Sequence, residues 1–511
     1  MSALPSRVTV FRSGNSIVLD PPSKRLEAIL APKLSYTEKV FLRGKEYYQA
    51  KKAKQPTVFD QVWECYTLDH KNRIATSFGF LSRIQRVLAK KGVEVVVNDL
   101  APHPRPEVYQ PRWDRLEGEQ FRYKQKEALE LIFAHENGRI DCPPGWGKSF
   151  VIGLAARALP KAKIAVITRR VEVMQQRIYP DLCGMLPDVG IVGGGMRRKG
   201  RRVMCYTAGS IHHADGDEDI VFFDEGHEAA SDDCAYKMAK FDHARMWAFS
   251  ATWGMRLDNK DMRCEAMFGP VRLKVTYKEA VKHDMIVPIV VQLSDVIMDV
   301  DPCSGLDGVD KERHGIWGNE YRNKLIQRDA RTYDDDVQCL VTVKTLEHGL
   351  HLKKLLPEYE LVYNPESQDP KDWRWFEKQN LLPDDFKILT DKRRERLRKR
   401  FERGLLKKVI ATPVWNVGVN MKHLQVILRA DAGGSPINDT QIPGRGSRII
   451  EIDGRKKKCA VVHDYLDQFN SGYERKASGR VKSYKKNEWE VRFPDKKKRS
   501  LLRQLMEWGE V

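Results

Sequence analysis

The chain has 511 residues, which at roughly 150 residues per domain suggests three or four domains. Hydrophobic residues make up 41% of the chain and charged residues 31%, and no apolar run approaches the ~18 residues that a membrane span needs. We therefore expect a protein without a membrane segment. The net charge of +19 fits a polyanionic partner, although basic proteins without such a partner are common.

The nine cysteines are scattered along the chain, and none of them forms a CxxC pair. This pattern disfavours a disulfide framework and a zinc module, and it favours a reducing compartment. The first residues, MSALPSRVTVFRSG, contain no apolar stretch long enough for a secretory signal. We therefore expect a cytoplasmic protein.

Residues 1–110 mix short strand-like runs with basic helices. Apolar residues at helical spacing predict a helix in 76–88, and the valine-rich run at 92–98 predicts a strand. The proline-rich segment 101–106 is typical of a domain boundary. We therefore expect a small α+β accessory domain over residues 1–110.

From about residue 115, apolar runs alternate with helical patterns, which predicts parallel sheets joined by crossover helices. The strands expected are 164–168, 220–223 and 246–249 in a first block, and 337–341, 361–363, 387–389, 409–412, 426–430 and 459–463 in a second. A polar stretch around 301–320 lies between them. We expect two tandem α/β domains, over 111–285 and 286–470, followed by a basic C-terminal tail over 471–511.

A glycine-containing turn opens the first block. Residues 141–150 read DCPPGWGKSF and precede a helical pattern. Glycines allow backbone N–H groups to surround a phosphate, and the N-terminus of the next helix adds its positive dipole end. Lys148 would reach the β- and γ-phosphates of a nucleotide, and the Ser149 hydroxyl would bind Mg²⁺. The alternative is an ordinary glycine-rich turn followed by a chance Lys-Ser pair.

Two carboxylates follow the apolar run at 220–223 directly. Ligands of open α/β sheets bind at the carboxyl ends of the strands, which is where Asp224 and Glu225 would lie. Asp224 would hold Mg²⁺, and Glu225 would polarise the attacking water. Taken alone, an Asp-Glu pair after a strand is more often a solvated turn.

These motifs, together with others in the same order, resemble those of superfamily 2 helicases of the DExH type over most of residues 118–484. DCPPGWGKS is similar to motif I, DEGH (224–227) to motif II, and Ser250-Ala251-Thr252 to motif III. Further matches are an adenine-reading element at 121–125, motif Ia at 164–176, a threonine-containing nucleic-acid contact at 206–211, motif V at 411–420, and QxxGRxxR, motif VI, at 441–448.

Three positions depart from the usual motifs. Cys142 stands where the first glycine of motif I is usual. Gly226 stands where Ala, Cys or Val is commoner, and Trp253 stands where Pro is usual. Within the superfamily, the sequence is most similar to phage and bacterial UvsW-like helicases. Their small basic N-terminal domain ends in a helix and a strand like those at 79–97.

The resemblance implies two RecA-like domains, an accessory domain that binds nucleic acid, and the cofactors ATP and Mg²⁺. The catalytic residues implied are Lys148, Asp224, Glu225, Gln441, Arg445 and Arg448, with Ser149 and Asp224 on the metal. Nucleotide binding would involve Arg122, Gln125, Pro144, Gly145, Trp146, Gly147, Lys148, Ser149 and Gly418. Nucleic acid would contact Thr207, Ser210, Thr412, Arg197 and Arg198, and Ser250 and Thr252 would couple the two sites.

An arginine from the second domain would neutralise charge that develops on the γ-phosphate during hydrolysis. If residues 441–448 are helical, Arg445 and Arg448 share one helix face and both could enter the ATP site. The expected substrate is single-stranded, forked or branched DNA, or an RNA–DNA hybrid, in recombination, replication or repair. We expect a monomer in the cytoplasm of a bacterium or a phage-infected host. The alternatives are an RNA helicase and a nucleic-acid-binding adaptor with an inactive nucleotide site.

Overall fold

The structure is a computed structural model that describes residues 3–42, 44–254, 258–383, 386–415, 419, 421–452 and 454–494. The chain forms two compact units. Unit 1 comprises Met1–Pro143 and Gly147–Thr276, and unit 2 comprises Pro144–Trp146 and Tyr277–Val511. The main boundary therefore follows Thr276 rather than residue 285, and the expected accessory domain belongs to unit 1. Within the described ranges, no helix is long and apolar enough to cross a membrane.

Unit 1 begins with a five-stranded sheet in the order β5-β6-β2-β1-β7. The strands are β1 (Arg7–Ser13), β2 (Ser16–Asp20), β5 (Tyr66–Leu68), β6 (Ile74–Ser77) and β7 (Glu94–Ala101), and the helices are α1 (Lys24–Leu30) and α3 (Leu81–Ala89). Alternate residues of β1 and β2 face a core that also buries Leu26, Ile84 and Leu88 from the helices. The helix and strand expected in 76–88 and 92–98 are confirmed as α3 and β7.

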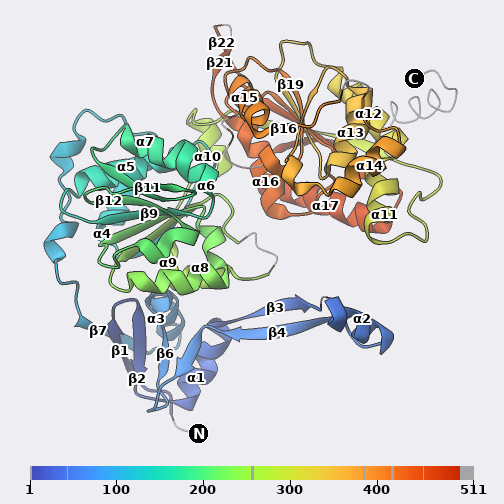
Figure 1. Cartoon of the computed structure of the whole chain (residues 1–511). Coiled ribbons are helices and arrows are strands. Elements are labelled where there is room, and N and C mark those ends of the chain that lie inside the picture. The colour runs from blue at the N-terminus through green and yellow to red at the C-terminus, as the bar shows by residue number, and fades with distance from the viewer. Residues whose placement is uncertain are drawn as a thin grey trace. The chain divides into compact units, whose positions relative to one another are not determined.

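A separate two-stranded ribbon leaves this small domain. Strands β3 (Ser35–Phe41) and β4 (Val58–Glu64) pair antiparallel, and helix α2 (Gly44–Lys52) lies at the tip. In Figure 1 the ribbon runs out from the five-stranded sheet and carries α2 at its far end. We call β3, α2 and β4 the arm.

The second sheet of unit 1 has eight strands in the order β11-β10-β12-β9-β13-β14-β8-β15. They are β8 (Asn137–Asp141), β9 (Ile164–Thr168), β10 (Val189–Gly193), β11 (Met196–Arg198), β12 (Val203–Thr207), β13 (Ile220–Asp224), β14 (Arg245–Ser250) and β15 (Val271–Lys274). All neighbours pair in parallel except the β10–β11 hairpin. Strands β9 and β13 are buried along their whole length, as is usual when helices cover both faces of a parallel sheet.

Helices cover both faces of this sheet. They are α4 (Gln125–Ala134), α5 (Lys148–Ala158), α6 (Val171–Val173), α7 (Tyr179–Cys183), α8 (Asp232–Met238) and α9 (Asp261–Phe268). In Figure 1, α5 and α7 lie on one face, and α8 and α9 lie on the other. The carboxyl ends of the strands therefore form an edge between two helical layers, where ligands of such sheets bind.

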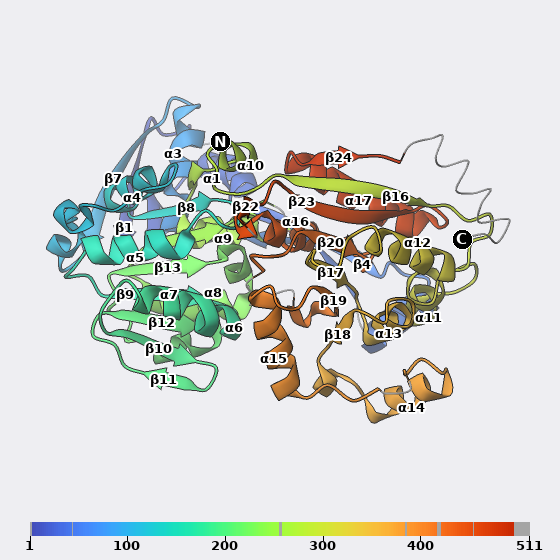
Figure 2. The same ribbon diagram turned by 90° about the horizontal axis from the view of Figure 1, so that it is seen from above.

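Unit 2 contains a seven-stranded parallel sheet in the order β18-β19-β17-β20-β23-β16-β24. The strands are β16 (Ile289–Val296), β17 (Cys339–Thr342), β18 (Glu360–Val362), β19 (Lys408–Ala411), β20 (Val426–Arg429), β23 (Ala460–Asp467) and β24 (Glu490–Arg492). Figure 2 shows β16, β23, β20, β17, β19 and β18 in succession across this sheet. A short hairpin of β21 (Glu451–Ile452) and β22 (Arg455–Lys456) precedes β23.

The helices of unit 2 are α10 (Tyr277–Lys282), α11 (Gly308–Glu312), α12 (Glu320–Ala330), α13 (Leu346–Leu355), α14 (Pro370–Lys378), α15 (Asp391–Glu402), α16 (Pro436–Gly444) and α17 (Ser471–Lys486). Helices α12 and α13 contact each other, as do α16 and α17. The expected fold class is thus confirmed: two tandem parallel-sheet α/β domains of the RecA-like class follow a small α+β domain.

Three expectations about unit 2 are wrong. Residues 387–389 form no strand, and the polar stretch 301–320 follows β16 inside unit 2 instead of separating the two domains. Residues 471–492 form α17 and β24, and β24 pairs with β16, so they belong to the folded domain. Residues 495–511, which include the lysines at 496–498, lie outside the described residues.

Candidate active site

The turn between β8 and α5 contains two glycines with left-handed backbone conformations. Gly145 and Gly147 have φ angles of +92° and +104°, which residues with a side chain rarely adopt. A Cβ at Gly147 would also lie 2.6 Å from the Gln125 Nε2 atom. Helix α5 begins at Lys148, directly after the turn, so its first N–H groups and its positive dipole end face this edge of the sheet.

The upstream element at 121–125 lies against the same turn. Gln125 is the first residue of α4 and is buried, and its Oε1 atom accepts a hydrogen bond from the Arg122 N–H at 2.9 Å. The structure thus brings Gln125 next to Gly147. Pro144 and Trp146 lie in the turn itself, and Trp146 is fully buried.

Lys148 forms an ion pair with the acidic motif at the end of β13. Its Nζ atom lies 2.7 Å from Glu225 Oε1 and 3.6 Å from Asp224 Oδ1. Burial lowers the pKa of Lys148, but the two carboxylates outweigh burial and raise this pKa above its ordinary value. Burial raises the pKa of Glu225, but Lys148 and then His227 outweigh it and lower this pKa to about 2. Both groups are therefore charged at neutral pH.

Asp224 is the residue of this site whose carboxylate lacks hydrogen-bond partners among the described residues. Both of its carboxylate oxygens are buried and accept no hydrogen bond from the part of the chain that the structure describes. Its nearest cations are Lys148 at 3.6 Å and Arg177 at 3.9 Å. Buried polar atoms are normally hydrogen-bonded, because leaving one without a partner costs free energy.

An added cation with a preference for oxygen ligands would satisfy Asp224. Mg²⁺ fits this donor set, because it is usually bound by one or two protein oxygens together with phosphates and water. Asp224 and the buried Ser149 hydroxyl on the first turn of α5 are the residues that would hold it. Within the described ranges, no group of three or more His, Cys, Asp or Glu residues could hold a metal ion.

His227 joins the acidic motif to the end of the neighbouring strand β14. The distances from its Nδ1 atom are 2.8 Å to Ser250 Oγ and 3.0 Å to Thr252 Oγ1, and these two hydroxyl oxygens lie 3.2 Å apart. His227 Nδ1 also lies 3.5 Å from Glu225 Oε2. A change at Glu225 therefore has a short, buried route to Ser250 and Thr252, the two residues expected to couple the sites.

Gly226 and Trp253, two of the departures from the usual motifs, share one space. A Cβ at Gly226 would lie 2.7 Å from the Trp253 ring and 2.6 Å from the Ala248 Cβ atom. The Trp253 indole is buried and donates from Nε1 to the Ile140 carbonyl oxygen at 3.1 Å. Trp253 thus fills the space that a side chain at position 226 would take. Sequence reasoning noted both departures but missed that they compensate each other.

The side chains expected to contact nucleic acid in unit 1 differ in exposure. Thr207 and Ser210 are buried, with their hydroxyl oxygens 3.0 Å apart, and Ser210 also donates to backbone carbonyls. A ligand here would meet the backbone around the exposed Gly209 instead of these hydroxyls. Arg197 and Arg198 lie on the exposed strand β11, and Arg198 donates to the Tyr179 hydroxyl at 3.2 Å.

In unit 2, α16 carries Gln441 and ends at Gly444, so the expected helix does not extend over both arginines. Arg445–Ser447 form a 3₁₀ turn, and Arg448 follows in an extended conformation. The two arginines therefore do not share a helix face. The Arg445 Nη1 atom donates to the Trp415 carbonyl oxygen at 3.0 Å, and the Trp415 N–H donates to the Thr412 carbonyl oxygen at 3.3 Å. Gly418 lies outside the described residues.

Two buried groups that sequence reasoning missed hold this arginine turn. The Lys457 ammonium donates to the Leu424 carbonyl oxygen at 2.7 Å and to the Gly446 carbonyl oxygen. Burial lowers the pKa of Lys457 to about 8. Arg429 at the end of β20 donates to Asp439 on α16 at 2.7 Å, which fixes the helix that leads into the turn. No motif signals these residues, because their partners are distant in sequence.

No protein-family model and no curated protein matches the sequence. Several solved structures are similar to it. UvsW of bacteriophage T4 is 15% identical, with 95% of this chain and 99% of that chain covered and a TM-score of 0.40. Dbp5 of S. cerevisiae bound to RNA and ADP BeF3 is 13% identical, with coverages of 80% and 98% and a TM-score of 0.49. The ATP-dependent Type ISP restriction-modification enzyme LlaBIII bound to DNA is 12% identical, with coverages of 84% and 36% and a TM-score of 0.48.

Proposed function

We propose that this chain is an ATP-dependent helicase or translocase that remodels branched DNA or RNA–DNA hybrids. The observation that carries the proposal is the Asp224 carboxylate, which is buried without a hydrogen bond beside Lys148 at the carboxyl end of a buried parallel strand. The glycine turn that precedes α5 lies at the same edge of the sheet, because β14 pairs in parallel with both β13 and β8. A nucleoside triphosphate with its metal would supply an anion for the glycine turn and a cation for Asp224.

ATP binding would rearrange the Lys148–Glu225 ion pair. Lys148 is the cation available to the β- and γ-phosphates, and it now pairs with Glu225 at 2.7 Å. When Lys148 turns to the phosphates, Glu225 loses its nearest cation and its pKa rises from about 2 towards the ordinary range. Glu225 then becomes the group that orients the attacking water and accepts its proton.

The bound Mg²⁺ would neutralise charge on the β- and γ-phosphate oxygens. Asp224 and Ser149 are the residues that would hold it. The nucleotide base would lie towards Gln125, which is fixed by the Arg122 N–H.

The arginine turn of unit 2 would complete hydrolysis. Arg445 and Arg448 offer planar guanidinium groups that can donate two parallel hydrogen bonds to phosphate oxygens. Arginines in this role increase turnover by roughly 10³–10⁵-fold where they have been measured. Gln441 would help to position the attacking water. ATP would thereby favour closure of the two units, and ADP would favour their separation, which would move nucleic acid bound to both.

Nucleic acid would be held mainly through its phosphates. Arg197, Arg198, the backbone near Thr207 and Ser210, and Thr412 are the proposed contacts. Phosphate contacts carry no sequence information and release counterions, so binding should depend weakly on sequence and strongly on salt.

The test is ATP hydrolysis by Glu225→Gln, with single-stranded DNA, forked DNA, RNA–DNA hybrid and RNA as separate stimulators. We expect turnover to fall at least roughly 100-fold while ATP and DNA still bind, because Gln cannot accept the proton. Glu119→Gln is the matched control, since Glu119 is 27% exposed and paired with Arg157, whereas Glu225 is 26% exposed and paired with Lys148. Normal turnover in Glu225→Gln would refute the catalytic role, and stimulation by RNA alone would refute the DNA assignment.

A further inference from the structure

The arm is an isolated ribbon with an unusual surface. Its seven pairs run from Ser35 opposite Glu64 to Phe41 opposite Val58, and within the described chain no third strand joins them. Two-stranded ribbons are marginally stable in water and usually hide their apolar side chains. Here Phe41 is 60%, Tyr48 71% and Phe59 45% exposed.

The same part of the arm is strongly basic. Residues 39–58 contain six Lys or Arg residues and one acidic residue, Glu46. Lys39 and Lys45, together with Lys51, Lys52 and Lys54, are exposed. A second copy of this chain is disfavoured as the occupant, because it would bring like charges together. Exposed aromatic rings interleaved with cations match nucleic acid with unpaired bases, since rings stack on base faces and lysines contact phosphates.

The root of the arm is anchored to the domain that carries the acidic motif. Glu38 pairs with Lys260 at 3.2 Å, and Asn259 donates to the Thr37 carbonyl oxygen at 2.8 Å. The Arg263 guanidinium on α9 lies over the Trp63 ring, 5.3 Å from its centroid. These contacts fix the direction in which the arm leaves the domain.

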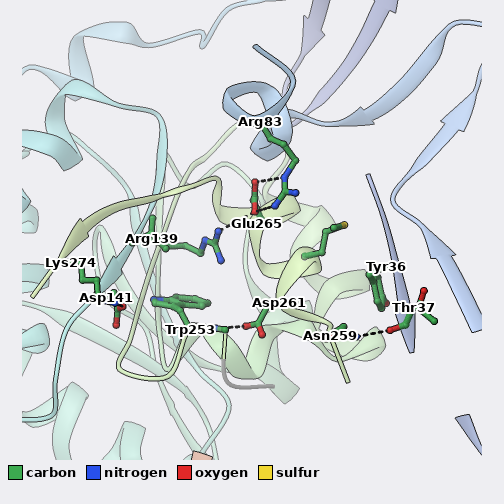
Figure 3. Close-up of a pocket in the computed structure, with 13 residues that line it drawn as sticks. Tyr36, Thr37, Arg83, Arg139, Asp141, Trp253, Asn259, Asp261, Glu265 and Lys274 are labelled. Carbon is green, nitrogen blue, oxygen red and sulfur yellow. Dashed lines mark hydrogen bonds and ion pairs between the residues drawn. The ribbon is translucent and has the colours of Figure 1, made fainter. Parts of the chain in front are cut away.

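A cavity of about 710 Å³ lies at this root (Figure 3). Tyr36 and Thr37 of the arm line one side of it, and Trp253 and Asp141 line the other. Trp253 follows Thr252 directly, and Asp141 is the last residue before the phosphate turn. The arm root, the end of β8 that leads into the phosphate turn, and Trp253 after β14 therefore line one cavity.

We propose that the arm binds nucleic acid at a point where paired strands separate, with Tyr48, Phe41 and Phe59 against unpaired bases and the tip lysines on phosphates. The proposal rests on the proposed function, because it assigns a substrate contact to the same motor. The root contacts link the arm to α9 and to the residues just before it, and Trp253 lines the cavity at the same root. Binding of a nucleic-acid fork to the arm would thereby affect the region of Ser250 and Thr252.

The first experiment compares the Tyr48→Ala/Phe59→Ala variant with the wild-type full chain by fluorescence anisotropy on forked, single-stranded and blunt duplex DNA. We expect the double variant to bind forked and single-stranded DNA about 10- to 100-fold more weakly and blunt duplex as wild type does, because only the first two expose base faces. Tyr236→Ala is the control, since Tyr236 is 84% exposed on α8, outside the arm. Circular dichroism checks that each variant is folded.

A second variant removes charge instead of rings. Lys51→Gln/Lys52→Gln/Lys54→Gln should weaken binding to all three DNAs and reduce the slope of log affinity against log salt concentration by about 2 to 3. An unchanged slope together with unchanged fork affinity in the ring variant would overturn the proposal. Loss of self-association without loss of DNA affinity would overturn it in favour of contact between copies. If wild-type ATP hydrolysis is not stimulated by any nucleic acid, the proposed function itself fails, and the arm is then judged by the binding data alone.

Discussion

Two clusters of buried charges in this molecule differ in how completely they are paired. In unit 2, Arg429 donates to Asp431 and Asp439, Arg480 donates to Asp464, and the Tyr484 hydroxyl donates to Asp464 at 2.7 Å. In unit 1, Asp224 accepts no hydrogen bond from the described chain although it is equally buried.

The difference separates a structural cluster from the proposed nucleotide site. The charged groups of the unit 2 cluster pair with one another. They hold α16 and α17 on the sheet and require no ligand. In the unit 1 cluster, Asp224 lacks a cation at hydrogen-bond distance within the described chain. Lys148 faces two carboxylates, Asp224 and Glu225, although one would balance its charge. Incomplete pairing in a buried place is costly, so it persists where a ligand completes it.

The largest effect should come from replacing the buried Lys148, with the buried Lys408 as its control. Lys148→Met should lower ATP turnover at least roughly 10³-fold, because no other lysine replaces its contact with the phosphates. Lys408 in unit 2 is the control: it is buried and donates to the Tyr333 and Asp334 carbonyl oxygens at 3.0 and 2.8 Å. Lys408→Met should lower the free energy of unfolding by about 1–3 kcal/mol and leave turnover per folded molecule near the wild-type value. Equal loss of turnover in both variants would break the comparison.

Two carboxylates should respond with opposite signs when they become amides. Asp464→Asn should lower the free energy of unfolding by about 3–5 kcal/mol, because Arg480 keeps its buried charge and loses its partner. Asp224→Asn should raise the unfolding free energy of the nucleotide-free protein by about 1 kcal/mol and abolish turnover, because it removes a carboxylate that lacks a hydrogen bond. Urea unfolding measures both. A loss of stability in Asp224→Asn would contradict the view that this site is strained without its ligand.

The last comparison concerns acid stability. The folded state lowers the pKa of Glu225 to about 2 from 4.5, so the ionised carboxylate contributes stability above pH 4.5 that is lost as the pH falls towards 2. The wild-type unfolding free energy should therefore decrease more steeply over this range than that of Glu225→Gln. Saturating ATP and Mg²⁺ should reduce the difference, because Lys148 then pairs with phosphate. Identical pH profiles without nucleotide would show that the ion pair contributes nothing.

Much of the fold could be predicted because buried parallel strands are continuous apolar runs. Ile164–Thr168 is the expected strand with its expected bounds. Strand β8 was missed because Asn137 and Arg139 interrupt its apolar pattern, although both are buried. The sequence predicted a tail in place of helix α17 for a similar reason. Two of the side chains that this helix buries are Arg480 and Tyr484, and such polar residues are usually expected at the surface.

For the candidate site, sequence spacing predicted the grouping of Lys148, Asp224 and Glu225, which the structure brings together. It could not predict the inward hydrogen bonds of Thr207 and Ser210, since a hydroxyl gives no sign of its direction. It also could not predict that α16 ends before Arg445. Pro443 lies near the end of that helix and hinders its continuation, but the exact end depends on the Lys457 contacts, which come from a different segment.

The shared space of Gly226 and Trp253 restricts how this protein can change. Restoring the commoner Ala, Cys or Val at position 226 would drive a Cβ into the indole and into Ala248, so the ordinary residue of the motif would be harmful here. Replacing Trp253 with a smaller residue would leave a void beneath the acidic motif. Each departure therefore suits the other, and a larger residue at position 226 would need a smaller one at position 253.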